Sequence, residues 1–562
     1  MSDFIGRPYE NEKNKAIKYV KQLLDKASVD NKQSDKEELA EILRLLDSKR
    51  YGLVWEQHAE KVEELMKTKI PVFEEIKERK IKNSTDPKYN FLLVGDNLHS
   101  LHILEKTDKG KVDVIYIDPP YNTGNKDFKY NDKFVSSNDE WFHSKWLSFM
   151  ESRLRVGVKL LKHDGVMFIS IGDNEYANLK LLMEDILPDG YVTTLHVEMS
   201  TVQGMKVKAA KEGGIVKNAE YILVYSKDGH KNIMKHQLYD PRPYDTHYSK
   251  YLDDNMNLIK LKDAFHAKYP KDKLEKLDKM FITNSNFQEF VKNNINRICA
   301  DDKVTGFKKE NYPVGKIIKV TKNGRKYFIY NNGRKMRQLL ILSASWGKAD
   351  DANNTVGFRK IRGDWWSGFY QDMGNINRSD KEGGVKFSNG KKPMRLITQL
   401  LKATTDKNSL VLDFFAGSGT TGQAVEELNK RDGGHRHFIL ATNNENNIAD
   451  EITYQRMKNI LDLYPNQINL KYFRTKFISK NEPHLEEKLL ANVKTLVELQ
   501  NLTDLEGSHI AIVITTKQVS ELNLTGVSKV YMRSRVRRFM EPEEQERYDE
   551  AGVQIIDIPD KY

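Results

Sequence analysis

The run from Val112 to Ile117 constrains the fold of this chain more than any other feature. Its residues, Val-Asp-Val-Ile-Tyr-Ile, are mostly apolar and β-branched, which is typical of a strand buried on both faces of a parallel sheet. The strand must end at Asp118, because Pro119 and Pro120 cannot donate hydrogen bonds to a neighbouring strand. The sequence therefore places a carboxylate and the ring of Tyr121 at the carboxyl end of a central strand, where open α/β sheets bind ligands.

These residue types suit the activation of an exocyclic amine on a nucleobase. Such an amine is a weak nucleophile, because its lone pair is delocalised into the ring. Asp118 could accept a hydrogen bond from one amine hydrogen and the Pro119 carbonyl from the other, while the base stacks on Tyr121. The alternative is a strand that simply ends in a proline turn, with Asp118 capping the segment that follows.

A glycine-rich loop lies far downstream. Leu410–Asp413 predicts another buried strand, and a helix is predicted over Gly422–Asn429. Between them, Gly417 and Gly419 permit tight backbone conformations and the close approach of a ligand, as in nucleotide-binding βαβ units. The loop lacks the lysine of an ATP-binding phosphate loop, so ATP is not the expected ligand. A purely structural tight turn is the alternative.

Together the two stretches carry a family resemblance. DPPY at Asp118–Tyr121 and FAGSG at Phe415–Gly419 resemble the catalytic and S-adenosylmethionine-binding motifs of DNA amino-methyltransferases. The catalytic motif comes first, as in their permuted β subgroup. Flanking stretches, among them Leu93–Leu98 and Leu470–Phe477, are similar to the modification (Mod) subunit of type III restriction–modification systems. The resemblance runs from about residue 50 to about residue 480 and implies an α/β fold with a doubly wound, Rossmann-like methyltransferase sheet.

The resemblance implies S-adenosylmethionine as cofactor and assigns catalysis to Asp118, Pro119, Pro120 and Tyr121. The residues it implies for cofactor binding are Asp96, Asp118, Lys392, Pro393, Asp413, Phe415, Gly417, Gly419, Thr420 and Glu445. For Asp96, a helix cap is the alternative. The ribose ligand stays open between Thr442, which stands where an acidic residue is expected, and Glu445 three residues later. No metal site is predicted.

Five regions are predicted along the chain. They are an N-terminal helical region (1–85), a methyltransferase catalytic half (86–230), an inserted target-recognition domain (231–380), a methyltransferase cofactor half (381–462) and a small C-terminal α/β domain (463–562). The polar segment from Asn122 to Asn138 predicts a mobile loop near the substrate, with Phe128 and Tyr130 exposed in its middle. The C-terminal domain is expected to serve dimerisation or contact with a nuclease partner.

Basic and aromatic residues interleave in the inserted region, where Asn323-Gly324 between two β-branched runs predicts a hairpin. Arginine and lysine can neutralise phosphates and read guanine edges. The candidate DNA contacts are therefore Arg325, Lys326, Arg334, Lys335, Arg337, Trp365 and Trp366. The net charge of +11 suits a polyanionic partner such as double-stranded DNA. A solvated basic face on an ordinary small domain is the alternative.

The amino-acid composition also indicates the cellular compartment and limits the possible binding partners. Cys299 is the only cysteine, which fits a reducing, cytoplasmic environment. No apolar run reaches the ~18 residues expected of a membrane span, so no membrane partner is predicted. The sequence contains no ATP-binding phosphate loop and no convincing nuclease carboxylate cluster. Cleavage of DNA would need a separate ATP-driven restriction (Res) subunit, and a homodimer is also expected.

The resulting hypothesis is site-specific methyl transfer from S-adenosylmethionine to N6 of adenine in duplex DNA, without a covalent enzyme intermediate. In the resembled family, DPPY usually accompanies adenine methylation. Three alternatives stay open: methylation of cytosine N4, methylation of RNA, and a DNA-recognition subunit that has kept the fold but lost turnover.

Overall fold

The computed structural model describes residues 12–29, 35–36, 38–40, 42–43, 55–202, 205–374, 376, 382–387 and 391–558. The chain divides into two compact units, Met1–His58 and Ala59–Tyr562. In the first unit, helix α1 (Glu12–Val29) buries Val20 and Ala27, which are seven residues apart and therefore share one helix face. The predicted helical structure over residues 1–11 and 44–54 lies outside the described residues. No described helix is long and apolar enough to cross a membrane.

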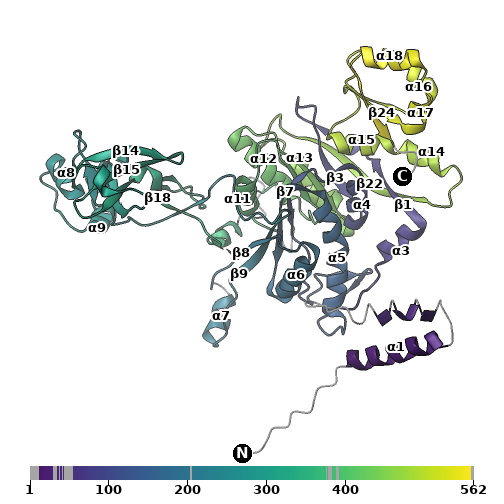
Figure 1. The fold of residues 1–562 in the computed structure, drawn as a ribbon, viewed down its shortest axis with the longest axis horizontal. Helices are drawn as coiled ribbons and strands as arrows, with labels where there is room; N and C mark the ends of the chain where they lie inside the picture. Colours follow the sequence, from purple (N-terminus) through teal and green to yellow (C-terminus); the bar gives the residue numbers. More distant parts are fainter. Residues whose placement is uncertain are drawn as a thin grey trace, which may run out of the picture. The chain divides into compact units, whose positions relative to one another are not determined.

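The second unit is built on an 11-stranded sheet with the order β1-β22-β3-β21-β20-β4-β7-β9-β8-β19, in which β2 also pairs with β22 (Figure 1). The bounds are β1 Lys69–Glu75, β2 Ile81–Lys82, β3 Asn90–Val94, β4 Val112–Ile117, β7 Leu161–Ile171, β8 Tyr191–Glu198, β9 Ala219–Ser226, β19 Trp365–Trp366, β20 Leu410–Asp413, β21 His437–Thr442 and β22 Asn469–Ser479.

The two strands that carry the sequence motifs are direct neighbours. β20 runs parallel to β4, with Val411 opposite Val114 and Leu412 opposite Ile115. The consecutive strands from β22 to β7 are all parallel, whereas β9 is antiparallel to both β7 and β8. The predicted doubly wound sheet is therefore confirmed, and the DPPY and FAGSG motifs end at the same edge of it.

Helices cover both faces of this sheet. Their bounds are α4 Asn97–Thr107, α5 Phe142–Leu160, α6 Asp173–Ile186, α11 Met394–Thr404, α12 Thr420–Asp432 and α13 Tyr454–Asn459. Buried residues of α11, α12 and α13 share one apolar core with Val114 and Tyr116 of β4, which alternate with residues that point to the other face. On that other face, Gly157 of α5 packs against Phe414 and Met167.

Two predicted domain boundaries are wrong. Residues 69–75 and 81–82, assigned to a helical region, form β1 and β2, and β1 pairs with β22 over its whole length. β22 itself, assigned to the C-terminal domain, lies in the main sheet next to β3. The helical periodicity of the preceding residues favoured a helical assignment for the whole region. Whether a short segment becomes a strand depends on its partner in the sheet, which here lies far away in the sequence. Lys471 of β22 also forms buried ion pairs with Glu75 and Glu498.

The inserted recognition region holds two further sheets, with the orders β12-β11-β13-β16-β15-β14 and β10-β18-β17. The elements are β10 Tyr239–Pro241, β11 Lys250–Leu252, β12 Leu258–Lys260, α8 Leu261–Lys268, α9 Leu277–Thr283, α10 Ser285–Asn293, β13 Ile298–Lys303, β14 Ile317–Lys322, β15 Arg325–Asn331, β16 Met336–Ile341, β17 Trp346–Lys348 and β18 Val356–Ile361. The predicted hairpin is confirmed: β14 and β15 pair around Asn323-Gly324, and both turn residues have positive φ, as a two-residue hairpin turn requires.

The end of the recognition region does not fall where it was predicted. β19, at Trp365–Trp366, pairs with β8 and so belongs to the main sheet rather than to the inserted domain. The predicted boundary at residue 380 lies outside the described residues. Past residue 480, a three-stranded parallel sheet forms the C-terminal subdomain, with β23 Ile510–Val513, β24 Lys529–Arg533 and β25 Gln554–Ile558. Its helices are α14 Leu485–Ala491, α15 Val493–Asn501, α16 Thr516–Glu521, α17 Ser534–Arg538 and α18 Pro542–Glu550.

Candidate functional site

Four neighbouring parallel strands end at one edge of the main sheet, and each end carries a residue predicted to serve the site. Asp96 follows β3, Glu445 follows β21, Asp413 closes β20 and Asp118 follows β4. The strand order places these four ends next to one another, although the chain visits them far apart. An edge of this kind, at the carboxyl ends of parallel strands, is the usual ligand-binding position in doubly wound sheets.

The Asp118 carboxyl group is the least satisfied acid at this edge. Its Oδ1 is buried, and no described residue donates a well-formed hydrogen bond to it, but the Lys392 ammonium lies 3.4 Å away. Burial raises the pKa of Asp118 to about 6; Lys392 opposes this shift and the Glu220 carboxylate adds to it. Near neutral pH the group is therefore a carboxylate with an acceptor oxygen still available.

Lys392, which is buried, and Glu220, which is half-buried, form an ion pair next to this carboxylate. Lys392 Nζ donates to Glu220 Oε2 at 2.7 Å and to the Tyr121 hydroxyl at 2.6 Å. Burial alone would lower the pKa of Lys392, but Asp118 and Glu220 raise it on balance. Burial alone would raise the pKa of Glu220, but the nearby Lys392 ammonium has the larger effect, and the pKa of Glu220 is lowered on balance. Both groups of the pair are therefore charged.

Tyr121 is held from several sides. Its hydroxyl donates to Glu220 Oε2 at 3.0 Å, and the Lys392 ammonium lies 4.7 Å from its ring centroid. A Cβ added to Gly172 would approach the ring to 2.9 Å, so only glycine lets the backbone pass this close. Trp146 Nε1 donates to the Pro120 carbonyl at 2.8 Å and fixes the proline turn that precedes Tyr121.

The residue after Tyr121 anchors the other side of the turn. Asn122 has a left-handed backbone, with φ of 54°, and its side-chain amide donates to the buried carboxylate of Glu175 at 2.5 Å. Glu175 also accepts from Asn178 at 2.7 Å, although burial keeps its pKa raised. This network holds the turn in an otherwise uncommon backbone conformation.

The glycine loop is tied to the end of β20. Asp413 Oδ1 accepts from the Phe415 N–H at 3.0 Å, and Oδ2 accepts from the Thr421 hydroxyl at 2.5 Å. Burial nevertheless raises the pKa of Asp413 to about 7. Gly417 has φ of 49° and Gly419 φ of 75°, which favours glycine at both positions. A Cβ added to Gly417 would meet only the Phe415 carbonyl oxygen, at 3.7 Å, so the loop presents bare backbone at the sheet edge.

Asp96 is a helix cap, which was the alternative offered for it. Its Oδ1 accepts from the Leu98 N–H at 2.9 Å at the start of α4 and from the buried Arg153 guanidinium at 3.1 Å. Asn97 donates to the Phe414 carbonyl at 2.8 Å, which joins this cap to the glycine loop. The Asp96 side chain is still partly exposed at the strand edge, so capping does not preclude a ligand there.

The segment after Tyr121 does not have the predicted exposure. Phe128 and Tyr130 are buried rather than exposed, because the Phe128 ring packs edge-on against Phe149, whose ring in turn contacts Phe415. Lys129, between them, pairs with Glu445 at 2.6 Å. The segment therefore reaches from the end of β4 to the residues that follow β21. Glu445, the candidate ribose ligand, is engaged by this lysine, whereas Thr442 is buried at the end of β21.

Several other predicted cofactor residues have mainly protein partners. Lys392 contacts the DPPY segment rather than the glycine loop, and Pro393 is the N-terminal cap residue of α11. The Thr420 hydroxyl is buried and accepts from the Arg456 guanidinium at 2.7 Å. Glu220, which the sequence did not single out, is the main residue of the Asp118–Tyr121–Lys392 cluster that was missed. A charged residue at the start of the buried run Tyr221–Tyr225 was the signal available for it.

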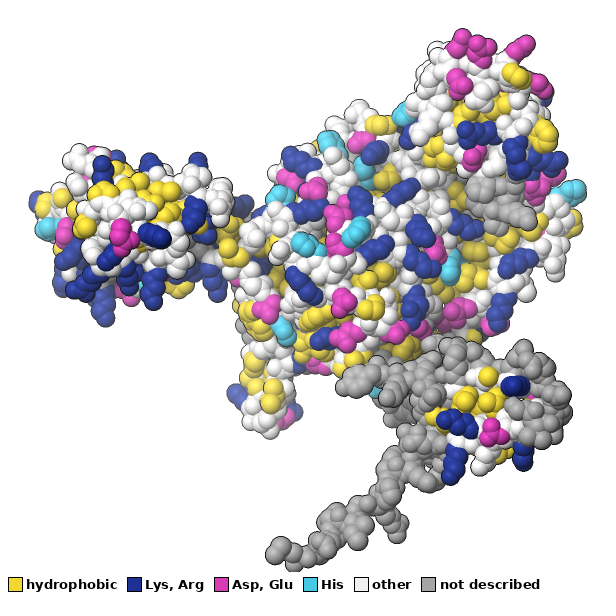
Figure 2. All heavy atoms as spheres, viewed as in Figure 1, with side chains coloured by type: hydrophobic (Ala, Val, Ile, Leu, Met, Phe, Trp, Pro, Cys, Tyr) yellow, Lys and Arg dark blue, Asp and Glu magenta, His cyan; other side chains and the backbone are white. Residues whose placement is uncertain are grey.

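The candidate DNA contacts fall into two groups. Arg325, Lys326, Arg334 and Lys335 are exposed at the ends of β14, β15 and β16, and Lys and Arg side chains are frequent on this region (Figure 2). Arg337 instead donates to Asp301 at 2.6 Å. For Trp366 the prediction is wrong: its side chain is only 3% exposed and belongs to the main core, whereas Trp365 is 55% exposed.

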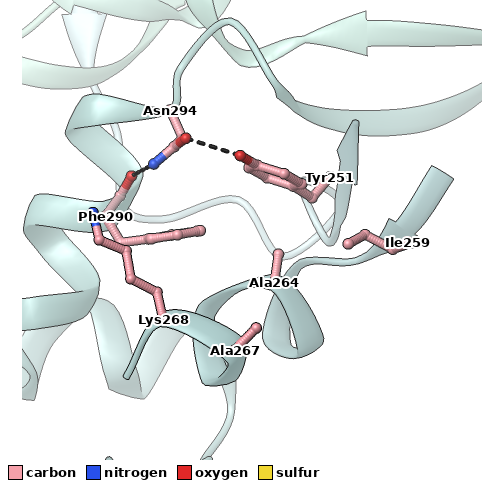
Figure 3. Close-up of a pocket in the computed structure, with 7 residues that line it drawn as sticks. All are labelled: Tyr251, Ile259, Ala264, Ala267, Lys268, Phe290 and Asn294. Carbon is pink, nitrogen blue, oxygen red and sulfur yellow. Dashed lines mark hydrogen bonds between the residues drawn. The ribbon is translucent and has the colours of Figure 1, made fainter. Parts of the chain in front are cut away.

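The recognition region also contains a cavity of about 430 Å³. Its lining residues are Tyr251, Ile259, Ala264, Ala267, Lys268, Phe290 and Asn294 (Figure 3). The Tyr251 hydroxyl donates to Asn294 at 3.0 Å, so these two polar side chains of the lining already satisfy each other. No residue of the DPPY or FAGSG motif lines it, and the chemistry of the chain is therefore concentrated at the sheet edge instead.

The sheet edge fits a cofactor with a positively charged reacting centre. Asp118 supplies a carboxylate with a buried oxygen that lacks a well-aligned donor, Phe415 supplies an aromatic ring, and Gly417 supplies half-exposed backbone. Asp96 and Glu445 supply further carboxylates along the same edge. These are the donor and acceptor types that a sulfonium, an amino acid moiety and a nucleoside would require.

Comparison with known proteins agrees with this geometry. Residues 112–462, more than half of the chain, match the N6/N4 methyltransferase family model described as DNA methylase. The chain is 32% identical to the StyLTI Mod subunit of a type III restriction–modification enzyme from Salmonella typhimurium, over 66% of this chain and 56% of that protein. It is 30% identical to the EcoPI Mod subunit of Escherichia phage P1, over 63% and 58%. It is also 29% identical to the type II methyltransferase M.KpnI of Klebsiella pneumoniae, over 72% and 91%. This chain thus spans about half the length of the Mod subunits that it matches.

Proposed function

This chain belongs to the DNA methylase family, and we propose that it transfers a methyl group from S-adenosylmethionine to N6 of adenine in duplex DNA. When bound, S-adenosylmethionine supplies an electrophilic methyl group on a sulfonium. In this proposal Phe415, Gly417 and Gly419 hold the cofactor beside Asp413. Asp96 contacts its adenine and Glu445 its ribose, once the Glu445 carboxylate exchanges Lys129 for the hydroxyls.

The protein's own contribution is to orient the amine. Asp118 accepts a hydrogen bond from one hydrogen of the adenine amine and the Pro119 carbonyl accepts from the other, so that the nitrogen lone pair points at the methyl group. Tyr121 supplies a face on which the base stacks once it has left the duplex. Lys392 and Glu220 fix the Tyr121 hydroxyl and the Asp118 carboxylate. Positioning and charge placement then provide the rate enhancement.

One observation carries the proposal. The buried Oδ1 of Asp118 lacks a well-formed hydrogen bond from any described residue, at the tip of a strand whose direct neighbour, β20, leads into the glycine loop. This oxygen has the Lys392 ammonium at 3.4 Å as an ion-pair partner but no well-aligned donor, so it can accept a further hydrogen bond, and a substrate amine would supply it. The same contacts could serve the amine of cytosine, so the base that is methylated is decided by experiment.

The relatives support a more specific assignment. We propose that the chain is a modification subunit of a type III restriction–modification system. Three relatives that each align with more than 60% of this chain are named Mod subunits of such enzymes. Double-stranded DNA is then its substrate, a separate ATP-dependent restriction subunit is its partner for cleavage, and it acts as a homodimer. The exposed Arg325, Lys326, Arg334 and Lys335 are proposed to contact DNA.

The test is incorporation of labelled methyl groups into unmethylated genomic DNA from S-adenosylmethionine. The protein should label duplex DNA in preference to RNA. Asp118→Ala should abolish labelling while binding of S-adenosylmethionine, measured by calorimetry, survives. Glu550→Ala, at an exposed carboxylate on α18, is the matched control and should label normally. Turnover by the Asp118→Ala protein, or no labelling of DNA by the unaltered protein, would refute the proposal.

A further inference from the structure

A basic arm joins β8 to β9 near the Asp118 cluster's Glu220. This β8–β9 arm, described over residues 199–202 and 205–218, includes α7 (Met205–Lys211) and a tip at Gly213–Ile215, and it lies beyond the paired ends of the two strands (Figure 1). It connects directly to Glu220, the partner of Tyr121. Its composition and its anchoring both point to a contact with the substrate.

The base of the arm is fixed beside Tyr121. The N–H groups of Met199 and Ser200 donate to the Asn218 carbonyl at 3.0 and 3.2 Å. Lys217 pairs with Asp173 at 2.6 Å, and Asp173 follows the glycine that packs against the Tyr121 ring. Three residues lead from Asn218 to Ile215, so the tip stands within about 11 Å of this anchored base along the chain.

The tip presents apolar side chains to solvent. Ile215 is fully exposed, at 102%, and Val202 on the opposite branch of the arm is 44% exposed. Gly213 has φ of 91°, and a Cβ placed on it would meet nothing within 4 Å, so the backbone there is also open. Single exposed apolar residues are ordinary, but these two share one arm anchored beside the ring proposed to receive the base.

The rest of the arm is cationic. Lys208 and Lys211 are exposed on α7, and the one acidic residue beside them, Glu212, lies 3.8 Å from Lys208. Lysine side chains attract phosphates, whereas an isoleucine gains nothing from a phosphate and can insert between base steps. Cations along the arm with an apolar tip therefore fit a nucleic-acid duplex better than a protein surface.

We propose that Ile215 is a wedge that enters the base stack at the target site and fills the space left when the adenine turns toward Tyr121. Lys208 and Lys211 hold the neighbouring phosphates. This inference rests on the proposed function, because it requires a base to leave the duplex. A wedge aids the separation of paired bases, so its loss should matter for a paired target and should not matter for an unpaired one.

The experiment uses the full chain with S-adenosylmethionine and two synthetic duplexes. The target sequence is first read from the positions that the unaltered protein methylates in genomic DNA. One duplex is fully paired, and the other has an abasic site opposite the target adenine. Ile215→Ser should slow single-turnover methylation of the paired duplex about tenfold or more, and should stay within about twofold of the unaltered rate on the other duplex.

Two control variants isolate the effect. Ile215→Leu keeps an apolar side chain at the tip and should retain the rate on both duplexes. Phe539→Ser removes an apolar side chain that is 67% exposed on the C-terminal subdomain and should also retain both rates. Unchanged molar mass of the Ile215→Ser protein in solution would show that the tip is not a contact between two copies of the chain.

The outcomes separate the two proposals. If the unaltered protein methylates DNA and Ile215→Ser methylates the paired duplex equally fast, the wedge is refuted and the proposed function stands. The wedge is also refuted if Ile215→Ser is slowed equally on both duplexes, or if it changes the molar mass. If the unaltered protein methylates no DNA at all, both proposals fall.

Discussion

The Lys392 ammonium lies 3.4 Å from the Asp118 carboxylate, although the two residues come from opposite halves of the methyltransferase sheet. Lys392 precedes α11, and Asp118 ends β4. Glu220 completes the cluster at 2.7 Å from the same ammonium. Two carboxylates therefore share one cation, and the one that is less well satisfied is the group proposed to bind the substrate amine.

This cluster predicts an acid limb in the rate of methyl transfer. Burial raises the pKa of Asp118 to about 6, against the opposing effect of Lys392. Protonated Asp118 loses its negative charge and is a weaker acceptor for the amine hydrogen bond, so the single-turnover rate should fall as the pH decreases through about 6. Lys392→Met should move this limb to higher pH, because it removes the cation that lowers the pKa of Asp118. Glu220→Gln should move it to lower pH.

Single-turnover rates at a series of pH values measure the limb. Lys517→Met, at an exposed lysine on α16, is the matched control and should leave the limb in place. Circular dichroism checks that each variant is folded. A limb that stayed at the same pH in both Lys392→Met and Glu220→Gln would mean that Asp118 is not the titrating group.

Alanine substitutions at two glycines near α12 should have similar effects on stability but different effects on the affinity for S-adenosylmethionine. Gly417 and Gly433 flank α12 and both have positive φ, 49° and 64°. Alanine at either position should cost about 1 kcal/mol of the free energy of unfolding through backbone strain alone, because neither added Cβ meets an atom closer than 3.7 Å. Only Gly417→Ala, however, places a methyl group at the edge proposed to hold the cofactor.

Calorimetric titration with S-adenosylmethionine separates the two variants. Gly417→Ala should weaken binding about tenfold, as crowding of a fitted site does, while Gly433→Ala should bind as the unaltered protein does. Equal affinity in the two variants would place the cofactor away from this loop.

Local sequence patterns were sufficient to predict the two strand ends that carry the motifs. The apolar run before Asp118 marks the end of β4, and the glycine turn after Asp413 marks the end of β20. The two motifs come together because β4 and β20 are neighbouring parallel strands. Glu220 could not be found in this way. Its strand is antiparallel to its neighbours, so its amino end reaches the edge where the parallel strands have their carboxyl ends, and only the sheet topology reveals this.

Burial was also hard to predict from local patterns. Phe128 and Tyr130 stand among polar residues, yet they are buried through contact with Phe149 on α5. Adjacent Trp365 and Trp366 face opposite sides of β19, as successive strand residues must, so one is exposed and the other lies in the core. The composition of each segment gave no sign of which side would be covered.

The recognition hairpin predicts a change in the salt dependence of DNA binding. Arg325 and Lys326 are exposed at the start of β15 and are proposed to contact phosphates. Alanine at either position should lower the slope of log affinity against log salt concentration by about 1. Arg337→Ala should leave that slope unchanged and destabilise the fold, because its guanidinium is held by Asp301 at 2.6 Å. Fluorescence anisotropy with a labelled duplex at several salt concentrations measures the slope, and a larger change for Arg337→Ala than for Arg325→Ala would reverse the assignment.

The most direct test of the whole account is mass spectrometry of the nucleosides in unmethylated DNA after incubation with the protein and S-adenosylmethionine. Methyl transfer by the proposed mechanism should give N6-methyladenine with the unaltered protein and none with Asp118→Ala. N4-methylcytosine in place of N6-methyladenine, or N6-methyladenine formed equally by the Asp118→Ala protein, would contradict it.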